Sequence, residues 1–234
     1  MGRTIPPNRL QDLLACATQV FIAHGYRRAQ MADVAAAMGV AKGTLYLYVE
    51  SKHALFAAAL RHADDPPPDP SDLDLPLKTP APDELEDELR ARLAEEALPE
   101  SLQRALARKH GSDGKAEFEG IVRELYARSR RRRTAIKLID RCGRDHPALA
   151  EIFYRSGRFS QLEQLTRYLE DRIRRGYLRP VRDAAVSARF VIEAIATWAV
   201  HIHWDPAPQT VDPADAEETV VQFVLGGLSK QEGA

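Results

Sequence analysis

The sequence has few cysteines and no long hydrophobic run. Its only cysteines are Cys16 and Cys142, so it cannot hold a disulfide framework, and this usage fits a reducing compartment. No apolar stretch approaches the roughly 20 residues of a membrane-spanning helix. The first residues lack the apolar core of a secretory signal peptide. We therefore expect a cytoplasmic protein with no membrane partner.

The sequence also lacks the motifs of the common enzyme classes. It contains no Gly-rich phosphate loop, no nucleophile elbow and no metal-binding motif. His201 and His203, with Cys142 as a third candidate, come nearest to a metal site. Histidines two residues apart on a helix point to different faces, which argues against a shared ion. We therefore predict neither an enzyme nor a cofactor or metal site.

A helix-turn-helix pattern occupies the stretch from Met31 to Lys52. A short helix with one apolar face runs into Gly39, and glycine suits the left-handed residue that ends a helix. A second short helix follows, in which Leu45 and Val49 are spaced so that both can point inward. Two helices joined by a short turn that contains glycine form the motif whose second helix enters the major groove of DNA.

In and around this stretch lies a spaced set of residues: Gly25-Tyr26, Asp33-Val34-Ala35, Gly39-Val40, Gly43-Thr44-Leu45-Tyr46, Tyr48 and Ser51-Lys52. Over about residues 9–60 they closely resemble the DNA-binding domain of the tetracycline-repressor (TetR) family. Two positions differ from the family pattern. The family usually has Thr near the position of Ala29, and Ser or Thr near the position of Ala41. The resemblance implies that the residues facing DNA are Lys42, Gly43, Thr44, Tyr46, Tyr48 and Lys52.

These residues are expected to contact DNA in different ways. Gly43 allows the backbone to approach the phosphates, and the two tyrosines can donate to phosphate or stack on a sugar or a thymine methyl group. Lys42 and Thr44 are suited to reading base edges. Two alternatives stay open: Tyr48 is instead a core aromatic residue, and Lys52 is instead a solvated surface cation.

The N-terminal segment is basic although the whole chain has a net charge of −1. Residues 1–62 contain seven Lys and Arg against three Asp and Glu, and seven minus three gives +4. A small basic domain on a neutral chain is typical of a DNA-binding module, with chance variation in surface charge as the alternative. Before this domain's first helix, Pro6-Pro7 predict an extended arm whose Arg3 reaches the DNA, or else a disordered tail.

Composition divides the chain into three parts. Residues 1–62 form the helix-turn-helix domain, with a first helix over about residues 9–23. Residues 63–82 contain seven prolines among acidic residues, which excludes a regular helix and predicts an acidic linker. Helical periodicity dominates residues 83–234. The predicted fold is therefore all-α, with an N-terminal three-helix DNA-binding domain and a C-terminal helical ligand-binding and dimerisation domain.

Two C-terminal segments resemble a subunit interface. Residues 183–203 are apolar on nearly every side, so a helix there must bury two faces. A last helix begins after Asp212, and Gly226-Gly227 allow another backbone to approach it closely. Together they suggest an isologous four-helix dimer interface, which the family resemblance also implies. The predicted interface residues are Ile195, Trp198, Val220, Val221, Val224 and Leu228.

The family resemblance further implies a switch in which a small molecule in the C-terminal domain releases the DNA. We expect a homodimeric repressor whose recognition helices enter successive major grooves of a pseudo-palindromic double-stranded operator, about 34 Å apart. A regulator with a collapsed pocket and a helical protein-interaction module are the alternatives. The residues considered for contact with a largely apolar effector, each with plain core or interface as its alternative, are Phe118, Ile121, Tyr126, Ile139, Phe153, Phe190, Glu193 and Trp198.

Overall fold

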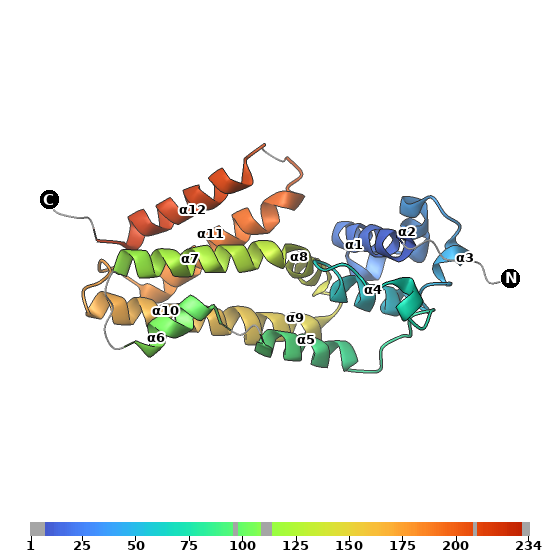
Figure 1. The fold of residues 1–234 in the computed structure, drawn as a ribbon, viewed down its shortest axis with the longest axis horizontal. Coiled ribbons are helices and arrows are strands. Elements are labelled where there is room, and N and C mark those ends of the chain that lie inside the picture. Colours follow the sequence, from blue (N-terminus) through green and yellow to red (C-terminus); the bar gives the residue numbers. More distant parts are fainter. Residues whose placement is uncertain (1–7, 96–97, 109–113, 208–209, 231–234) are drawn as a thin grey trace. The chain divides into compact units, whose positions relative to one another are not determined.

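The computed structural model describes residues 8–95, 98–108, 114–207 and 210–230. Over these ranges the regular elements are all helices, so the all-α prediction is confirmed (Figure 1). The predicted N-terminal arm with Arg3 lies outside the described residues.

Long-range contacts divide the chain into two compact units. The N-terminal unit comprises Met1–Ala91 and Thr134–Phe153. The C-terminal unit comprises Arg92–Arg133 and Tyr154–Ala234. The first unit thus includes a segment from the middle of the sequence, which helical periodicity alone does not reveal. The predicted division at residues 62 and 83 stays a prediction about domains.

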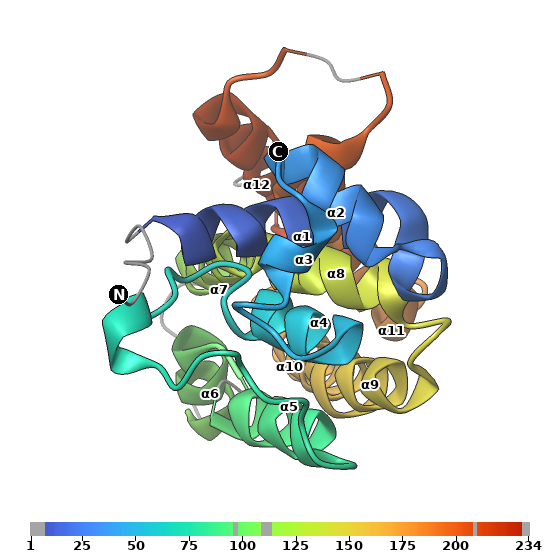
Figure 2. The same ribbon diagram turned by 90° about the vertical axis from the view of Figure 1, so that its right-hand side faces the viewer.

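The N-terminal unit begins with four helices around an apolar core, drawn in blue and cyan in Figure 2. They are α1 (Arg9–Arg28), α2 (Met31–Met38), α3 (Lys42–Leu45) and α4 (Lys52–Arg61). Leu13 of α1, Leu45 of α3 and Leu55 of α4 are completely buried. Phe21 meets Phe56 edge to face, with ring centroids 5.3 Å apart. The apolar face of α1 packs against α2 and α4, and α3 packs against α2.

α1 is kinked at a glycine. The sequence predicts a first helix that ends at Gly25, and this residue does leave the helical conformation, with φ 73° and ψ 164°. Glycine adopts a positive φ without the steric cost that a side chain brings. A further turn continues to Arg28, and the N–H of Ala29 donates to the Gly25 carbonyl at 3.1 Å. The observed α1 is therefore longer than predicted because a second short turn follows the glycine.

Two helices from the middle of the sequence, α8 (Arg133–Cys142) and α9 (Pro147–Ile152), complete the N-terminal unit. Arg141 donates from Nε to the Ile22 carbonyl at 2.9 Å. The carboxylate of Asp145 accepts from the backbone N–H of Arg27 at 2.7 Å. These contacts satisfy backbone groups on both sides of the kink in α1, where the helix itself offers no partners.

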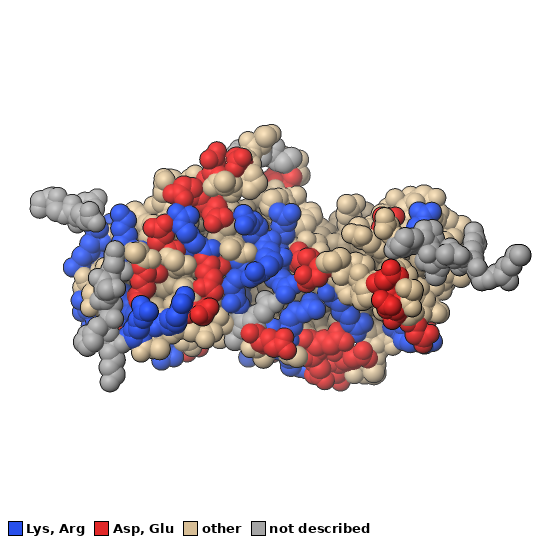
Figure 3. Space-filling view, viewed as in Figure 1, with Lys and Arg blue, Asp and Glu red and all other residues tan. Residues whose placement is uncertain are grey.

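The acidic segment from residue 64 to residue 82, called the proline-rich segment below, follows α4. It contains only a short 3-10 turn, Pro70–Asp72, because proline cannot supply the N–H groups of a regular helix. Figure 2 shows it as a long connection to α5 (Glu84–Glu95). Acidic side chains gather over α5 on the face seen in Figure 3. Arg61 at the end of α4 pairs with two of them, Glu84 and Glu88, at 3.2 and 2.7 Å.

The C-terminal unit contains five helices that pack on one another. They are α6 (Glu100–Ala107), α7 (Gly114–Arg131), α10 (Ser160–Arg174), α11 (Ala184–Ala199) and α12 (Pro213–Leu228). A π-helical stretch, Phe153–Phe159, begins at the last residue of the N-terminal unit and leads into α10. α11 packs against α7, α10 and α12. Phe118 and Tyr168 stack with centroids 6.0 Å apart, and neither exposes any surface.

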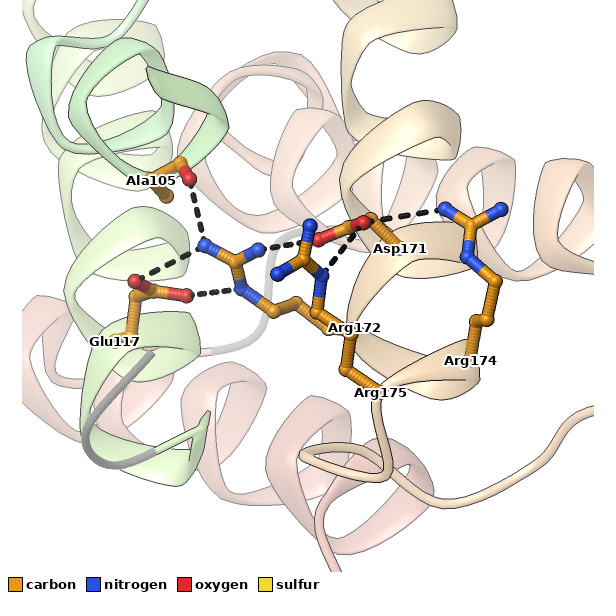
Figure 4. A network of polar contacts seen from close by, with 6 residues as sticks. All are labelled: Ala105, Glu117, Asp171, Arg172, Arg174 and Arg175. Carbon is orange, nitrogen blue, oxygen red and sulfur yellow. Dashed lines mark hydrogen bonds and ion pairs between the residues drawn. The ribbon is translucent and has the colours of Figure 1, made fainter. Parts of the chain in front are cut away.

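A buried arginine joins three helices of this unit (Figure 4). Arg172 of α10 is 1% exposed and donates to the Glu117 carboxylate of α7 at 2.7 Å and to the Ala105 carbonyl of α6 at 2.6 Å. Two further bonds reach the second carboxylate oxygen of Glu117, at 3.3 Å, and the neighbouring Asp171. A buried guanidinium is tolerated when each side of it is paired in this way.

Candidate nucleic-acid interface

The turn between α2 and α3 has the predicted geometry. Gly39 is left-handed, with φ 66° and ψ 35°, and its N–H donates to the Ala36 carbonyl at 3.1 Å. At the other end of α2, the Asp33 carboxylate accepts from the N–H of Gln30 at 2.8 Å. This bond caps the helix without the hydroxyl that the family usually has at the position of Ala29.

α3 is a single helical turn that exposes one face. Lys42 and Gly43 are exposed, Thr44 is half-buried and Tyr46 is 42% exposed. Leu45 between them is completely buried and anchors the turn to the core. A Cβ added at Gly43 would meet no protein atom within 4 Å, so packing does not require a glycine there. The exposed face is therefore free to approach another molecule at the backbone itself.

Tyr48 is not on that face. It is 4% exposed, so its ring belongs to the core of the N-terminal unit. The core alternative for this residue fits the structure, and the expectation that Tyr48 faces DNA is corrected. Its position just beyond the end of α3 explains the error, because the chain leaves the helical path there and periodicity no longer sets the direction of a side chain.

Lys52 is half-buried and bonded to the end of α1. Its Nζ donates to the carbonyls of Tyr26 at 2.9 Å, Ala29 at 3.1 Å and Arg27 at 3.4 Å. The ammonium also lies 4.5 Å from the centroid of the Tyr26 ring. A cation is favourable where the carbonyls of a helix end converge. Lys52 is therefore bonded within the protein rather than a solvated surface cation, and its contact with a DNA phosphate stays a prediction.

Sequence reasoning missed one residue of the exposed face. Leu47 is 49% exposed and follows the exposed Tyr46 directly. Because Leu45 points inward, the helical turn carries the next two residues outward, and this spacing in the sequence could have identified Leu47 as exposed. An exposed leucine beside a tyrosine is suited to apolar contact with a thymine methyl group.

The residues considered for effector contact divide between the two units. Phe118, Ile121 and Tyr126 are buried in α7 of the C-terminal unit. Ile139 is buried and Phe153 half-buried in the N-terminal unit.

Three further candidates lie on α11. Trp198 is half-buried. Phe190 is 65% exposed, and Glu193 pairs with Arg158 and Arg189 at 2.5 Å each. Phe190 and Glu193 therefore lie on the outer face of α11 rather than in the apolar interior of the unit. Their assignment to an effector site stays a prediction.

Most of the predicted interface residues are buried within their own unit. Trp198 is half-buried, and the others are the buried residues Ile195, Val220, Val221, Val224 and Leu228. The outer faces of α11 and α12 instead expose Val186 at 65%, Phe190 at 65% and Phe223 at 77%. A partner approaching these helices would therefore meet a different set of side chains from the predicted one.

Two further observations bear on the class of protein. Within the described ranges, no three His, Cys, Asp or Glu side chains are grouped so that they could hold a metal ion. His203 instead lies 3.2 Å from Arg133, measured from Nε2 to Nη1. No helix in the described part of the chain combines the length and the apolar character needed to cross a bilayer.

Comparison with known proteins connects this geometry to a family. Residues 13–59 match the family of bacterial regulatory proteins called tetR. The ketosteroid transcriptional regulator KstR2 of Mycobacterium tuberculosis has a similar fold, with 18% identity, 98% of each chain covered and a TM-score of 0.58. A tetR-family regulatory protein from Rhodococcus RHA1 is 16% identical over 95% of this chain and 98% of its own, with a TM-score of 0.51. No curated protein matches the chain.

Proposed function

Because the helix-turn-helix domain makes this chain a transcriptional regulator of the tetR family, we propose that it is a homodimeric repressor. In this proposal it binds a pseudo-palindromic operator and is released by a small, largely apolar effector. Its site of action is the cytoplasm, where the operator DNA lies. The observation that carries the proposal is the exposed face of α3, with Lys42, Gly43, Thr44, Tyr46 and Leu47, above a buried Leu45.

That face combines the groups that DNA recognition uses. Lys42 and Thr44 supply donors for base edges or phosphates, and Gly43 leaves the backbone open to close approach. Tyr46 and Leu47 add a phenol and an apolar surface next to each other. Phosphate contacts by this basic domain would make the affinity fall with increasing salt.

The proposed dimer forms through the outer faces of α11 and α12. Val186, Phe190 and Phe223 are apolar and largely exposed, and burying a side chain of this kind contributes about 1.5–3 kcal/mol. Gly226 and Gly227 are exposed beside them, and an added Cβ at either would meet nothing within 4 Å, so a second helix can approach closely. Two copies related by a two-fold axis would then form a four-helix interface.

Sedimentation of the purified chain tests the dimer. We expect a dimer for the wild type and a monomer for Phe223→Glu, because a charge at the centre of an apolar interface would have to be buried without a partner. Gln19→Glu, at an exposed position of α1 in the N-terminal unit and so away from the proposed interface, is the matched variant for a general effect of charge. A monomeric wild type at micromolar concentration would contradict the dimer.

The proposed effector site is in the apolar interior of the C-terminal unit, around α7. One observation favours the alternative of a regulator without an effector: Phe118 and Ile121 expose no surface, and the Phe118 ring is stacked on Tyr168. An apolar dye and a ketosteroid, the compound class in the name of KstR2, are suitable first probes. Binding that raises the Kd for operator DNA would support release by an effector, and probes that leave this Kd unchanged would favour the alternative.

Selection from random duplexes tests operator recognition. After several rounds with the full chain, we expect an enriched sequence with two inverted half-sites whose centres are about 10 base pairs, or a multiple of that, apart. This spacing follows from two recognition helices on one face of the duplex. No enriched sequence, or an enriched single site without inverted symmetry, would overturn the proposed mode of binding.

A further inference from the structure

The proline-rich segment pairs with the backbone that follows α3. Leu77 donates its N–H to the Tyr48 carbonyl at 2.8 Å, and its own carbonyl accepts from the N–H of Glu50 at 3.0 Å. These two bonds form an isolated parallel bridge between Val49 and Leu77. The chain between α3 and α4 thus gains backbone partners from a segment more than twenty residues away.

The side chains next to the bridge extend the contact. The Glu50 carboxylate accepts from Lys78 Nζ at 2.8 Å and from the backbone N–H of Thr79 at 3.1 Å. These hydrogen bonds, the one from Lys78 foremost, hold the pKa of Glu50 below its usual value. The hydroxyls of Ser51 and Thr79 lie 2.8 Å apart, and Ser51 Oγ also accepts from the N–H of Ala54, so it caps α4.

The far end of the proline-rich segment is also attached within the N-terminal unit. The two carboxylate oxygens of Asp64 accept from the N–H groups of Thr134 and Ala135, at 2.9 Å each. Asp64 therefore caps the start of α8. The prolines between the two attachments restrict the unfolded chain and so lower the entropy lost when the segment is fixed.

α3 needs support of this kind. Lys42–Leu45 is one turn of helix, and a single turn is not stable by itself. Its direction depends on what holds its two flanks. The turn at Gly39 fixes the first flank, and the second flank, from Tyr48 to Ser51, is the part bonded to residues 77–79.

We infer that residues 77–79 are positioning residues for DNA recognition, because they fix the backbone at the end of α3 and thereby the orientation of its exposed face. The inference rests on the proposed binding of operator DNA. Contact of these residues with phosphate is disfavoured, since the only cation among them, Lys78, is paired with Glu50, and Asp72 and Asp74 precede it. An acidic neighbourhood repels the DNA backbone.

The test compares Leu77→Pro with Asp74→Pro in the full chain. Leu77→Pro removes the N–H that donates to the Tyr48 carbonyl. Asp74→Pro makes the same backbone change after Leu73, whose extended conformation, φ −112° and ψ 140°, suits a residue before proline. Fluorescence anisotropy gives the Kd for the selected operator and for a scrambled duplex, and circular dichroism gives the thermal midpoint.

We expect Leu77→Pro to weaken operator binding on the order of tenfold, in keeping with one lost hydrogen bond in each of two protomers, and to leave the scrambled duplex unaffected. Asp74→Pro should keep the wild-type ratio of the Kd for the scrambled duplex to the Kd for the operator. If Leu77→Pro does not fold, Thr79→Val, which removes only the hydroxyl contact to Ser51, should lower the ratio about twofold to threefold.

Two results would overturn the inference. The first is that Leu77→Pro, or Thr79→Val used in its place, has the same ratio of Kd values as the wild type. The other is an equal loss of affinity for both duplexes in Lys78→Met, with a salt dependence reduced by about one phosphate contact, because Lys78 would then touch DNA directly. A wild type that does not distinguish the duplexes would instead refute the proposed operator binding, on which the inference rests.

Discussion

The ammonium of Lys52 donates to the carbonyl of Tyr26 across 2.9 Å and lies 4.5 Å from the centroid of the same residue's ring. The same ammonium donates to two more carbonyls at the end of α1, so the first residue of α4 caps the C-terminus of α1. We predict that Lys52→Met lowers the free energy of unfolding by about 1–3 kcal/mol, because two partly buried hydrogen bonds to carbonyls lose their charged donor.

Urea unfolding measures this effect, with Lys42→Met as the matched variant. Lys42 is exposed on α3, so its replacement should leave stability within about 0.5 kcal/mol of the wild type. It should weaken DNA binding instead. Equal stability of the wild type and Lys52→Met would contradict a structural role for Lys52.

Tyr46 and Tyr48, two residues apart, are predicted to respond in opposite ways. Tyr46→Ala should weaken operator binding with little change in stability, because the ring is 42% exposed. Tyr48→Ala should destabilise the protein by about 3–5 kcal/mol, because its ring is 4% exposed and its loss leaves a cavity. Urea unfolding and anisotropy on both variants check the pattern, and two variants with the same profile would disprove it.

These tyrosines show where sequence reasoning is sufficient and where it ends. The glycine that ends α2 and the inward Leu45 were predictable, because a left-handed turn and a helical period each follow from local chemistry. Tyr48 and Lys52 were assigned to DNA because the resemblance places them there. Their actual partners come from α1 and from the proline-rich segment, and no local pattern indicates such distant contacts.

The C-terminal unit makes the same point. Periodicity identified α11 and α12 as apolar, but both faces of α11 carry apolar residues, so the pattern could not say which face packs inward. Ile195 lies on the inner face and Phe190 on the outer one. The bond between Arg172 and Glu117 was not predicted either, because it joins helices 55 positions apart in the sequence.

Arg172 is predicted to be essential for the stability of the C-terminal unit. Arg172→Met leaves Glu117 and the Ala105 carbonyl without their donor, and breaking a buried pair in this way costs about 3–5 kcal/mol. The double variant Arg172→Met with Glu117→Gln should recover part of this loss, because no carboxylate is then left unpaired. Urea unfolding of both variants checks the prediction, and a double variant no more stable than the single one would contradict it.

His146 is predicted to make the N-terminal unit less stable in acid. Its ring stacks on Phe56 with centroids 4.9 Å apart, and burial, aided by the nearby His53, lowers its pKa below the usual value. The unfolded chain therefore takes up a proton at a higher pH than the folded one. Stability is full above about pH 6.5 and falls as the pH drops from there toward the lowered pKa.

Thermal unfolding between pH 8 and pH 5 measures this dependence, with His146→Phe as the comparison. Phenylalanine preserves an aromatic ring against Phe56 and cannot be protonated. The wild type should lose more stability than this variant over the range. Parallel curves for the two proteins would show that His146 is not responsible.

The central claim is that the exposed face of α3 recognises DNA. Its most direct test is the Kd of the wild type and of Tyr46→Ala for the selected operator and a scrambled duplex, at two salt concentrations. The account predicts tight binding of the operator that weakens with salt, and a loss of this preference in Tyr46→Ala although the variant remains folded. Equal affinity of the wild type for the two duplexes would contradict it.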